Sequence, residues 1–138
     1  MRKITKEDLF QMAKVPRLNL VNCLTGYKSA NLIGTISAEG VLNVAIFSSV
    51  THLGSEPPLL GFILRPMTVP RDTYKNIKEI GYFTLNHITE EMIADAHHTS
   101  SSYEEPISEF DKTKLESEFI DNHKVPFVKG SPVKLLCK

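Results

Sequence analysis

The stretch that decides the fold is NLIGTISAEGVLNVAIF, residues 31–47. Residues 31–37 are apolar or β-branched and predict a strand, and residues 41–47 repeat that pattern. Between them Ser37-Ala38-Glu39-Gly40 predicts a tight reversal, because Gly40 can adopt the positive φ that such turns require. The stretch therefore predicts a β-hairpin.

More short strands are expected on both sides of this hairpin, at residues 18–24, 59–64, 82–87 and 133–137. Residues 59–64 are apolar on both faces, which favours a strand buried inside a barrel or sandwich. The expected helices are one from the Thr5–Asp8 capping box to Pro16, one from Asp72 or Thr73 to Gly81, one capped by Thr89 that buries Met92, Ile93 and Ala96, and one around residues 110–119. Because helices and strands do not alternate regularly, the pattern predicts a mainly β fold, an antiparallel β-barrel with peripheral helices.

The composition describes one soluble domain. The 138 residues, 41% of them hydrophobic, fit a single domain spanning residues 1–138. Sixteen Lys and Arg residues balance sixteen Asp and Glu residues, which argues against nucleic acid or an anionic membrane as a partner. The longest apolar stretch, residues 59–64, is far shorter than the ~20 residues of a membrane span. Cys23 and Cys137 lack metal spacing and no secretory leader is recognisable, so a cytoplasmic protein is expected.

Several classes of functional site are excluded by their missing motifs. The sequence contains no GxGxxG, GxxxxGK[ST], HExxH or GxSxG. None of the five histidines is spaced with Cys or acidic residues as a metal box, so no metal site is expected. Residues 90–121 carry ten carboxylates against two lysines, a pattern typical of a solvated outer face.

Two segments are rich in groups that hold an anionic, planar ligand. The first, residues 47–52, places three hydroxyls and a run of backbone N–H donors just after a strand; the alternative is a plain polar strand exit. The second, residues 65–74, places Arg65 and Arg71 ahead of a helix start, where guanidinium groups and free N–H groups suit a phosphate. The alternative there is a surface salt bridge of Arg71 beside an ordinary helix cap.

Taken in order, these segments resemble the flavin reductase-like family of FMN-binding split barrels. The resemblance covers most of the chain and is carried by the order and spacing of short pieces: Asn31-Leu32-Ile33-Gly34-Thr35, Gly40-Val41-Leu42-Asn43-Val44-Ala45, Phe47-Ser48-Ser49-Val50, Pro57-Pro58-Leu59-Leu60-Gly61-Phe62, Arg65-Pro66, Arg71-Asp72-Thr73-Tyr74-Lys75-Asn76-Ile77, Gly81-Tyr82-Phe83-Thr84-Leu85-Asn86, Ala96-His97-His98-Thr99-Ser100, Ser108-Glu109-Phe110 and Pro126-Phe127-Val128.

The resemblance implies a split β-barrel with Greek-key connections, a homodimer with flavin at or near the subunit interface, and an oxidoreductase that transfers hydride between NADH or NADPH and FMN. Carried over by position, the ring of the flavin would meet Phe47, Ser48, Ser49, Val50 and Thr51. Its phosphate would meet Arg65, Arg71 and Thr73, and His97, His98 and Ser100 would lie near the flavin. FMN is expected in place of FAD because no pyrophosphate-binding GxGxxG turn exists. No catalytic acid, base or nucleophile is expected, because the flavin carries the chemistry.

The chain departs from the family at its C-terminal end. Relatives continue past the strand that matches residues 132–138, so the domain is expected to lack the family's last strands. A final strand at residues 133–137 would expose unpaired backbone groups, which predicts pairing with another chain. Two alternatives to an enzyme stay open: a flavin-binding module without turnover, and an inactive, truncated split-barrel fragment.

Overall fold

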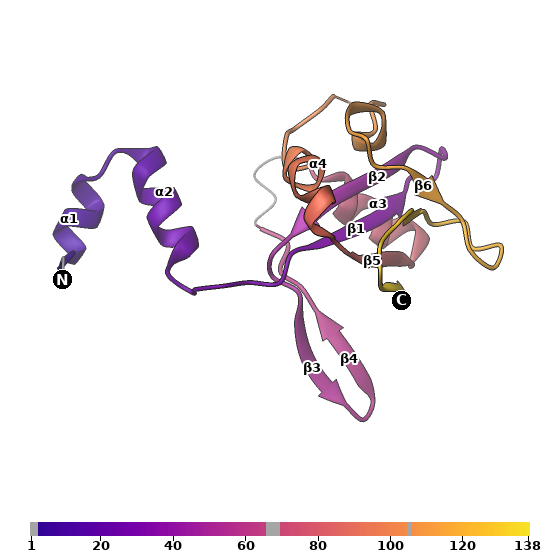
Figure 1. Ribbon diagram of the computed structural model, residues 1–138, viewed down its shortest axis with the longest axis horizontal. Helices are drawn as coiled ribbons and strands as arrows, with labels where there is room; N and C mark the ends of the chain where they lie inside the picture. The colour runs from indigo at the N-terminus through magenta and orange to yellow at the C-terminus, as the bar shows by residue number, and fades with distance from the viewer. Residues whose placement is uncertain (1–2, 66–69, 105) are drawn as a thin grey trace.

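The computed structural model describes residues 3–65, 70–104 and 106–138 (Figure 1). Its elements in chain order are α1 (Lys6–Gln11), α2 (Lys14–Cys23), β1 (Asn31–Ile36), β2 (Leu42–Phe47), β3 (Thr51–Ser55), β4 (Pro58–Gly61), α3 (Asp72–Ile80), β5 (Phe83–His87), the 3-10 helix η1 (Glu90–Met92), α4 (Ile93–His98), the 3-10 helix η2 (Glu109–Lys112), β6 (Ser117–Glu118), β7 (Phe127–Val128) and β8 (Lys134–Cys137). The prediction of a mainly β fold with peripheral helices is confirmed.

The body of the molecule is an open antiparallel sheet with the strand order β2-β1-β5-β8. The predicted hairpin forms its first half, with pairs running from Asn31–Phe47 to Ile36–Leu42. Gly40 closes the turn at a φ of 90°, and the Ser37 N–H donates to the Val41 carbonyl at 2.9 Å. The sheet does not close on itself, as expected for a split barrel, and its two edges are β2 and β8.

Each face of the sheet is covered by a different part of the chain. On one face an apolar core gathers Leu32, Val44, Ala96, Leu115 and Val128 from the sheet and from the segments after β5. The other face is covered by α3, which packs on β1 and β2 and ends at Gly81 with a φ of 78°. The predicted helix is therefore confirmed, although its N-cap is Arg71.

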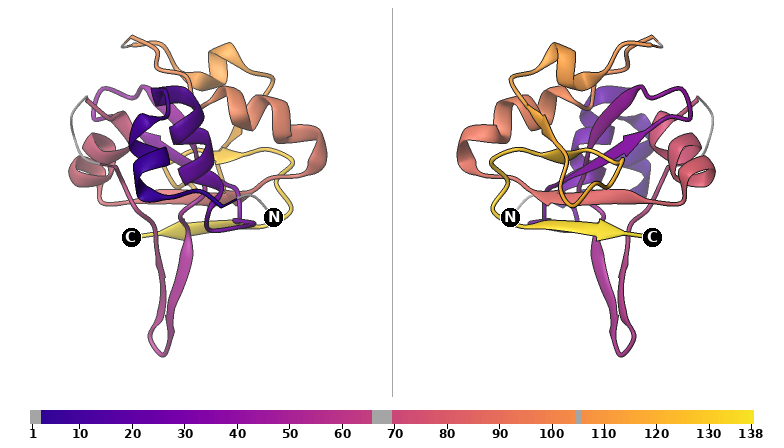
Figure 2. Two further views of the ribbon diagram at one scale, coloured as in Figure 1. Left: turned by 90° about the vertical axis from the view of Figure 1, so that its left-hand side faces the viewer. Right: turned by 90° about the vertical axis from the view of Figure 1, so that its right-hand side faces the viewer.

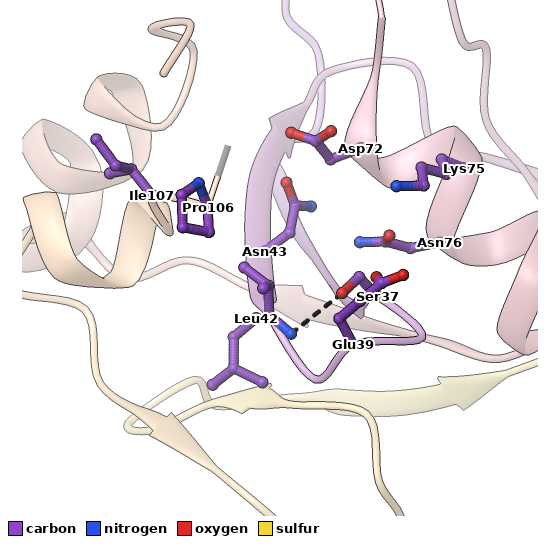
Figure 3. Close-up of a pocket in the computed structure, with 10 residues that line it drawn as sticks. Ser37, Glu39, Leu42, Asn43, Asp72, Lys75, Asn76, Pro106 and Ile107 are labelled. Atoms are coloured by element: carbon purple, nitrogen blue, oxygen red, sulfur yellow. Dashed lines mark hydrogen bonds between the residues drawn. The ribbon is translucent and has the colours of Figure 1, made fainter. Parts of the chain in front are cut away.

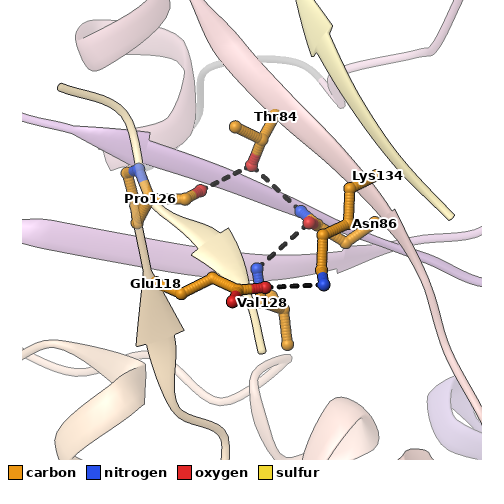
Figure 4. Close-up of polar contacts among 6 residues, drawn as sticks. All are labelled: Thr84, Asn86, Glu118, Pro126, Val128 and Lys134. Atoms are coloured by element: carbon orange, nitrogen blue, oxygen red, sulfur yellow. Dashed lines mark hydrogen bonds and ion pairs between the residues drawn. The ribbon is translucent and has the colours of Figure 1, made fainter. Parts of the chain in front are cut away.

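Polar contacts fasten β6 and β7 across the apolar core (Figure 4). The Thr84 hydroxyl donates to the Pro126 carbonyl at 2.6 Å, and the Asn86 carboxamide oxygen accepts from the Val128 N–H at 3.0 Å. Lys134 on β8 forms an ion pair of 2.6 Å with Glu118 on β6. A side chain at Gly34 would collide with the Pro126 carbonyl, so the crossing chain requires glycine there.

The N-terminal segment differs from its prediction. The Thr5–Asp8 capping box is confirmed, but α1 ends at Gln11, and the predicted strand at residues 18–24 is wrong because α2 occupies it. Pro16 does not end a helix. It lies in the first turn of α2, where its missing N–H costs no helical hydrogen bond. Neither helix contains a buried residue, and both stand apart from the sheet in Figure 1.

The predicted buried strand at residues 59–64 is also wrong. Only residues up to Gly61 belong to β4, and Leu59 and Leu60 are 50% and 46% exposed. The β3–β4 hairpin projects away from the body in every view (Figures 1 and 2). A run of apolar residues does not by itself show that the segment is buried within its own chain.

Two expectations after β5 need correction. The segment after Thr89 is helical, but the Thr89 side chain makes no capping hydrogen bond, and Ile93 is exposed, so of the three predicted residues only Met92 and Ala96 face inward. The helix expected at residues 110–119 is the single turn η2 followed by β6. The Thr113 hydroxyl donates back to the Glu109 carbonyl at 2.8 Å, a local bond that competes with helix continuation. Among the described residues, no helix is long and apolar enough to cross a membrane.

Candidate functional site

Strand β2 connects the segments that the sequence singled out. Phe47 is its last residue, and the chain from there to Thr51 leads into β3. The Ser49 hydroxyl accepts from the Ile63 N–H at 3.0 Å and donates to the Ile63 carbonyl at 3.2 Å. The Phe47 and Phe62 rings meet edge to face with centroids 5.0 Å apart. These contacts hold the predicted ring-binding segment beside the chain that leads to Arg65.

Within this segment the side chains differ in exposure. Ser48 and Thr51 are exposed, whereas Phe47, Ser49 and Val50 are half-buried. Arg65 is exposed as well, and residues 66–69 of the predicted phosphate segment lie outside the described residues. The exposed hydroxyls are therefore the groups of this segment that a ligand could reach.

The end of α4 approaches the same end of β2. The Thr99 hydroxyl accepts from the Ile46 N–H at 2.9 Å and donates to the Ala96 carbonyl at 2.8 Å. This bond brings residues 97–100 next to Phe47. The predicted residues His97, His98 and Ser100 are all exposed.

His98 is held in place, whereas His97 contributes through its backbone. The His98 Nε2 and the Tyr103 hydroxyl are 2.8 Å apart, and the two rings meet edge to face at 6.1 Å. The Ser100 hydroxyl donates to the His97 carbonyl at 2.7 Å. Both histidines remain predicted flavin contacts. The ring of His98 is the more restricted of the two, because Tyr103 contacts it.

The start of α3 lies against an earlier part of β2. Arg71 is half-buried, and its Nε is fully buried without a hydrogen-bond partner among the described residues. Thr73 is only 5% exposed, and its hydroxyl accepts from the Asn43 carboxamide at 3.2 Å. A buried, unpaired guanidinium N–H beside the first turn of a helix is suited to accept an anion.

A buried polar cluster fixes α3 on the sheet, and sequence reasoning missed it. The Asn43 carboxamide donates to the Thr35 hydroxyl at 2.9 Å as well as to Thr73, and the Asn76 carboxamide donates to Thr35 at 3.1 Å. We call Thr35, Asn43, Thr73 and Asn76 the polar cluster. Its only sequence signal is the placement of polar residues at inward positions of strand and helix.

Glu109 is a second residue that the sequence did not reveal. It is 8% exposed, and its Oε2 accepts from the Val44 N–H at 3.1 Å, at the outer edge of β2. Burial raises the pKa of Glu109, and the nearby charge of Asp72 adds to that effect. Residues 90–121 are mostly exposed, as the charge pattern predicted, but Glu109 is a buried exception.

A cavity of about 360 Å³ opens along β2 (Figure 3). It lies between the β1–β2 turn, the start of α3 and residues 106–107, and is lined by Ser37, Glu39, Val41, Leu42, Asn43, Asp72, Lys75, Asn76, Pro106 and Ile107. The pKa of Glu39 is lowered by its own backbone N–H, by the Ser37 hydroxyl and by Lys75. None of the predicted site residues is among those that line it. Within the described ranges, no three His, Cys, Asp or Glu side chains are grouped to hold a metal ion.

Comparisons with known proteins agree with the resemblance seen in the sequence. The family model described as "Flavin reductase like domain" matches residues 26–138. A crystal structure from Shewanella frigidimarina NCIMB 400, named as a provisional flavin reductase with a split barrel domain, is 41% identical with a TM-score of 0.92 and covers 99% of this chain and 67% of that chain.

Two further comparisons are more distant. The FMN-binding domain of a flavin reductases-like enzyme from Shewanella baltica OS155 is 24% identical with a TM-score of 0.69, over 80% of this chain and 56% of that one, which supports the fold. An uncharacterized protein of Aquifex aeolicus is 32% identical over 77% of this chain and 55% of its own. The chain thus spans about half the length of the curated relatives it matches. The family match over residues 26–138 shows that the chain belongs to the flavin reductase-like family of split-barrel proteins.

Proposed function

We propose that this chain binds FMN and serves as an oxidoreductase that passes hydride between NADH or NADPH and the flavin. Family membership supports flavin chemistry in general. The observation that carries the specific proposal is the Arg71 Nε, which is buried without a hydrogen-bond partner among the described residues. Such a donor costs stability unless an anion satisfies it, and a phosphate is the anion that FMN would bring.

The residues at the end of β2 fit the remaining parts of the ligand. Arg71 and the first turn of α3 would hold the phosphate, with Arg65 adding charge from the solvent side. Ser48 and Thr51 would offer hydroxyls to the polar edge of the flavin ring. Bound flavin would supply a two-electron acceptor and donor, so the protein has to supply only orientation and charge.

Other predicted residues would mainly hold the ligand-binding groups in position. The Thr73 hydroxyl accepts from Asn43 and is buried, so the contribution of Thr73 to phosphate binding would come from its backbone N–H at the helix start. Ser49 holds the chain before Arg65 in place, and Phe47 gives the site an aromatic wall. The Tyr103 hydroxyl would fix the His98 ring beside the ligand.

We also propose that the protein is a homodimer with the flavin at or near the subunit contact. The support is that the end of β2 is open to solvent at Ser48 and Thr51. A second subunit would cover a ligand bound there. Dimerisation and FMN binding would then strengthen each other.

The test of the flavin site is a titration of FMN and of riboflavin, which lacks the phosphate, into the full chain. Arg71→Ala should weaken FMN binding by about 30- to 150-fold, equivalent to about 2–3 kcal/mol, and should leave riboflavin binding unchanged. Arg71→Lys should recover part of that loss, and Lys78→Ala, which removes an exposed cation from the same helix, should have no effect. Equal weakening of both flavins would disprove the phosphate site.

A second measurement separates an enzyme from a binding module. Adding NADH or NADPH to the FMN-loaded protein should bleach the flavin absorbance near the visible maximum, because hydride transfer reduces the ring. Flavin that binds but is not bleached by either nucleotide would support a module without turnover. Extraction of the bound cofactor should yield FMN, because the sequence has no pyrophosphate-binding GxGxxG turn, and predominant FAD would contradict this assignment.

A further inference from the structure

Two parts of the molecule carry large apolar side chains that their own chain does not cover. The first is the N-terminal arm, residues 3–30, which contains α1, α2 and the linker to β1. The second is the β3–β4 hairpin, residues 51–61. Their exposed apolar residues are Phe10, Val15, Leu18, Val21, Leu24 and Tyr27 on the arm and Leu53, Leu59 and Leu60 on the hairpin, with exposures from 46% to 109%.

The arm and the hairpin project from one corner of the sheet. The Ser29 hydroxyl, at the end of the arm, donates to the Val50 carbonyl at the foot of the hairpin at 3.4 Å. From that corner the arm runs to the left and the hairpin runs downward in Figure 1, and the two also diverge in the views of Figure 2. The arm therefore does not cover the hairpin of its own chain. In a two-fold dimer, the arm of each copy could cover the hairpin of the other copy.

The amount of exposed apolar surface matches what a dimer needs. Burial of a large apolar side chain removes about 60–120 Å² from water, judged from its transfer free energy. Scaled by the exposed fractions, the nine side chains offer roughly 340–680 Å² of apolar surface per chain. A standard interface buries about 800 Å² on each partner, of which roughly 450 Å² is apolar, so the two parts together have the size that a stable contact needs.

The charges of the two parts are complementary. Five basic residues outnumber Glu7 and Asp8 on the arm, which gives residues 3–30 a net charge of +3; the basic residues are Lys3, Lys6, Lys14, Arg17 and Lys28. The hairpin carries one formal charge, Glu56, at its exposed tip. Opposite charge at the rim steers such a contact and disfavours arm against arm.

The arm is a defined structure in spite of its lack of internal support. The family model begins at residue 26, so α1 and α2 lie outside the family domain. The likeness to the Shewanella frigidimarina structure nevertheless covers 99% of the chain and therefore includes the arm. A pair of helices without a buried residue that keeps its placement in a relative indicates support from outside the chain.

We propose that the arm of one copy packs its apolar residues against the β3–β4 hairpin of a second copy, and that the same contact is made in return. The result is a closed two-fold dimer in which each contact occurs twice. The inference rests on the homodimer proposed above, but not on the flavin chemistry. The contact would place the second copy next to residues 47–51, the candidate ring-binding segment.

The test is sedimentation of the full chain across a dilution series without FMN. The arm variant Leu18→Gln/Val21→Gln and the hairpin variant Leu59→Gln/Leu60→Gln should each raise the dimer dissociation constant by at least about tenfold. The matched control Asn19→Gln/Asn22→Gln changes polar residues at the same spacing on the same helix and should leave the constant unchanged. Circular dichroism should show unaltered folding in all three, because none of these residues is buried.

Mixing the two variants gives the decisive readout. A heterodimer of the arm variant and the hairpin variant keeps one intact contact, between the normal arm of one chain and the normal hairpin of the other. The mixture should therefore dimerise more tightly than either variant alone. This recovery is specific to an arm–hairpin exchange and is not expected for an arm–arm or a strand–strand contact.

Three results would overturn the proposal. A wild-type chain that stays monomeric at every concentration would do so, as would a dimer that one double variant weakens while the other leaves it intact. A dimer that both variants leave intact but Leu136→Pro dissociates would assign the contact to β8. FMN titration of the same samples keeps the two ideas apart, since a dimer of the proposed kind without FMN binding would refute only the flavin function.

Discussion

The two edges of the sheet are finished in opposite ways. Along β2 the outward N–H groups of Val44 and Ile46 donate to Glu109 and Thr99 at 3.1 and 2.9 Å. Along β8 the register places the backbone groups of Val133 and Leu135 toward β5, so those of Lys134 and Leu136 point outward, and no described residue bonds to them. Leu135 and Leu136 are each 36% exposed.

The comparison shows that an edge strand can be closed by single side chains from a distant segment. Glu109 and Thr99 reach β2 from 65 and 53 residues away in the chain. They occupy the hydrogen-bonding positions that a further strand would need, so β2 cannot extend the sheet. Among the described residues no side chain bonds to the outward groups of β8, so that edge can accept a strand.

The largest loss of stability is expected when the side chain that caps β2 at the buried Val44 is removed. Glu109→Ala leaves the Val44 N–H without an acceptor and should lower the free energy of unfolding by about 2–3 kcal/mol. Glu109→Gln keeps a carbonyl acceptor and should recover most of that loss. Chemical denaturation of the three proteins measures both differences. Equal stability of the Ala and Gln variants would show that the bond to β2 is not what Glu109 contributes.

A smaller effect is expected at the second cap. Thr99→Val preserves the shape of the side chain but removes the acceptor for the Ile46 N–H and the donor to the Ala96 carbonyl. The expected loss is about 1–2 kcal/mol by denaturation. The same change should speed amide exchange at Ile46 more than at Val44. Uniform acceleration at both amides would mean that the two caps act as one unit.

The pH dependence of stability sharpens the comparison further. Burial raises the folded-state pKa of Glu109 above its unfolded value, so its favourable contribution is complete below the ordinary carboxyl pKa. That contribution is lost as the pH rises through the raised, folded-state pKa. The stability of the wild type relative to Glu109→Gln should therefore fall with rising pH across this window. A difference that stays flat, or that grows with pH, would contradict a desolvated carboxyl.

The smallest effect is expected at the open edge. Leu136→Pro removes an outward N–H that has no partner in the described part of the chain, so relative to Leu136→Ala it should change monomer stability by less than about 1 kcal/mol. Thermal unfolding at low protein concentration gives the comparison. A much larger loss would show that this N–H is bonded in solution.

Local sequence signals predicted the parts of the fold that depend on local chemistry. The Thr5–Asp8 capping box, the turn at Gly40 and the helix end at Gly81 each depend on one side chain or one φ angle, and each is present. Parts that depend on a distant partner were not predictable in this way. Residues 18–24 and 59–64 are apolar segments that pack on little of the described chain, so their pattern indicates neither a strand nor burial.

In the candidate site, too, residues that act through local chemistry could be predicted, whereas those that depend on a distant partner could not. Arg71 could be singled out because guanidinium groups before a helix suit a phosphate whatever the rest of the fold does. Glu109 could not, since nothing in an acidic surface segment marks the one carboxylate that turns inward to a strand 65 residues away. The roles of Phe47, Ser48, His97 and the other predicted ligand contacts stay predictions until a flavin is titrated.

The polar cluster also fixes the register of β2 against β1 and the position of α3 on both strands. Thr35 and Asn43 are directly paired across β1 and β2, and both Asn43 and Asn76 donate to the same Thr35 hydroxyl. If β2 slipped by one residue, Asn43 would turn to the opposite face, and its buried amide would lose both of its acceptors, the Thr35 and Thr73 hydroxyls. Apolar packing alone would tolerate small shifts between α3 and the strands, whereas these hydrogen bonds form in only one register. The position of α3, which begins next to Arg71, is thereby fixed on the sheet by two hydrogen bonds, between Asn43 and Thr73 and between Asn76 and Thr35.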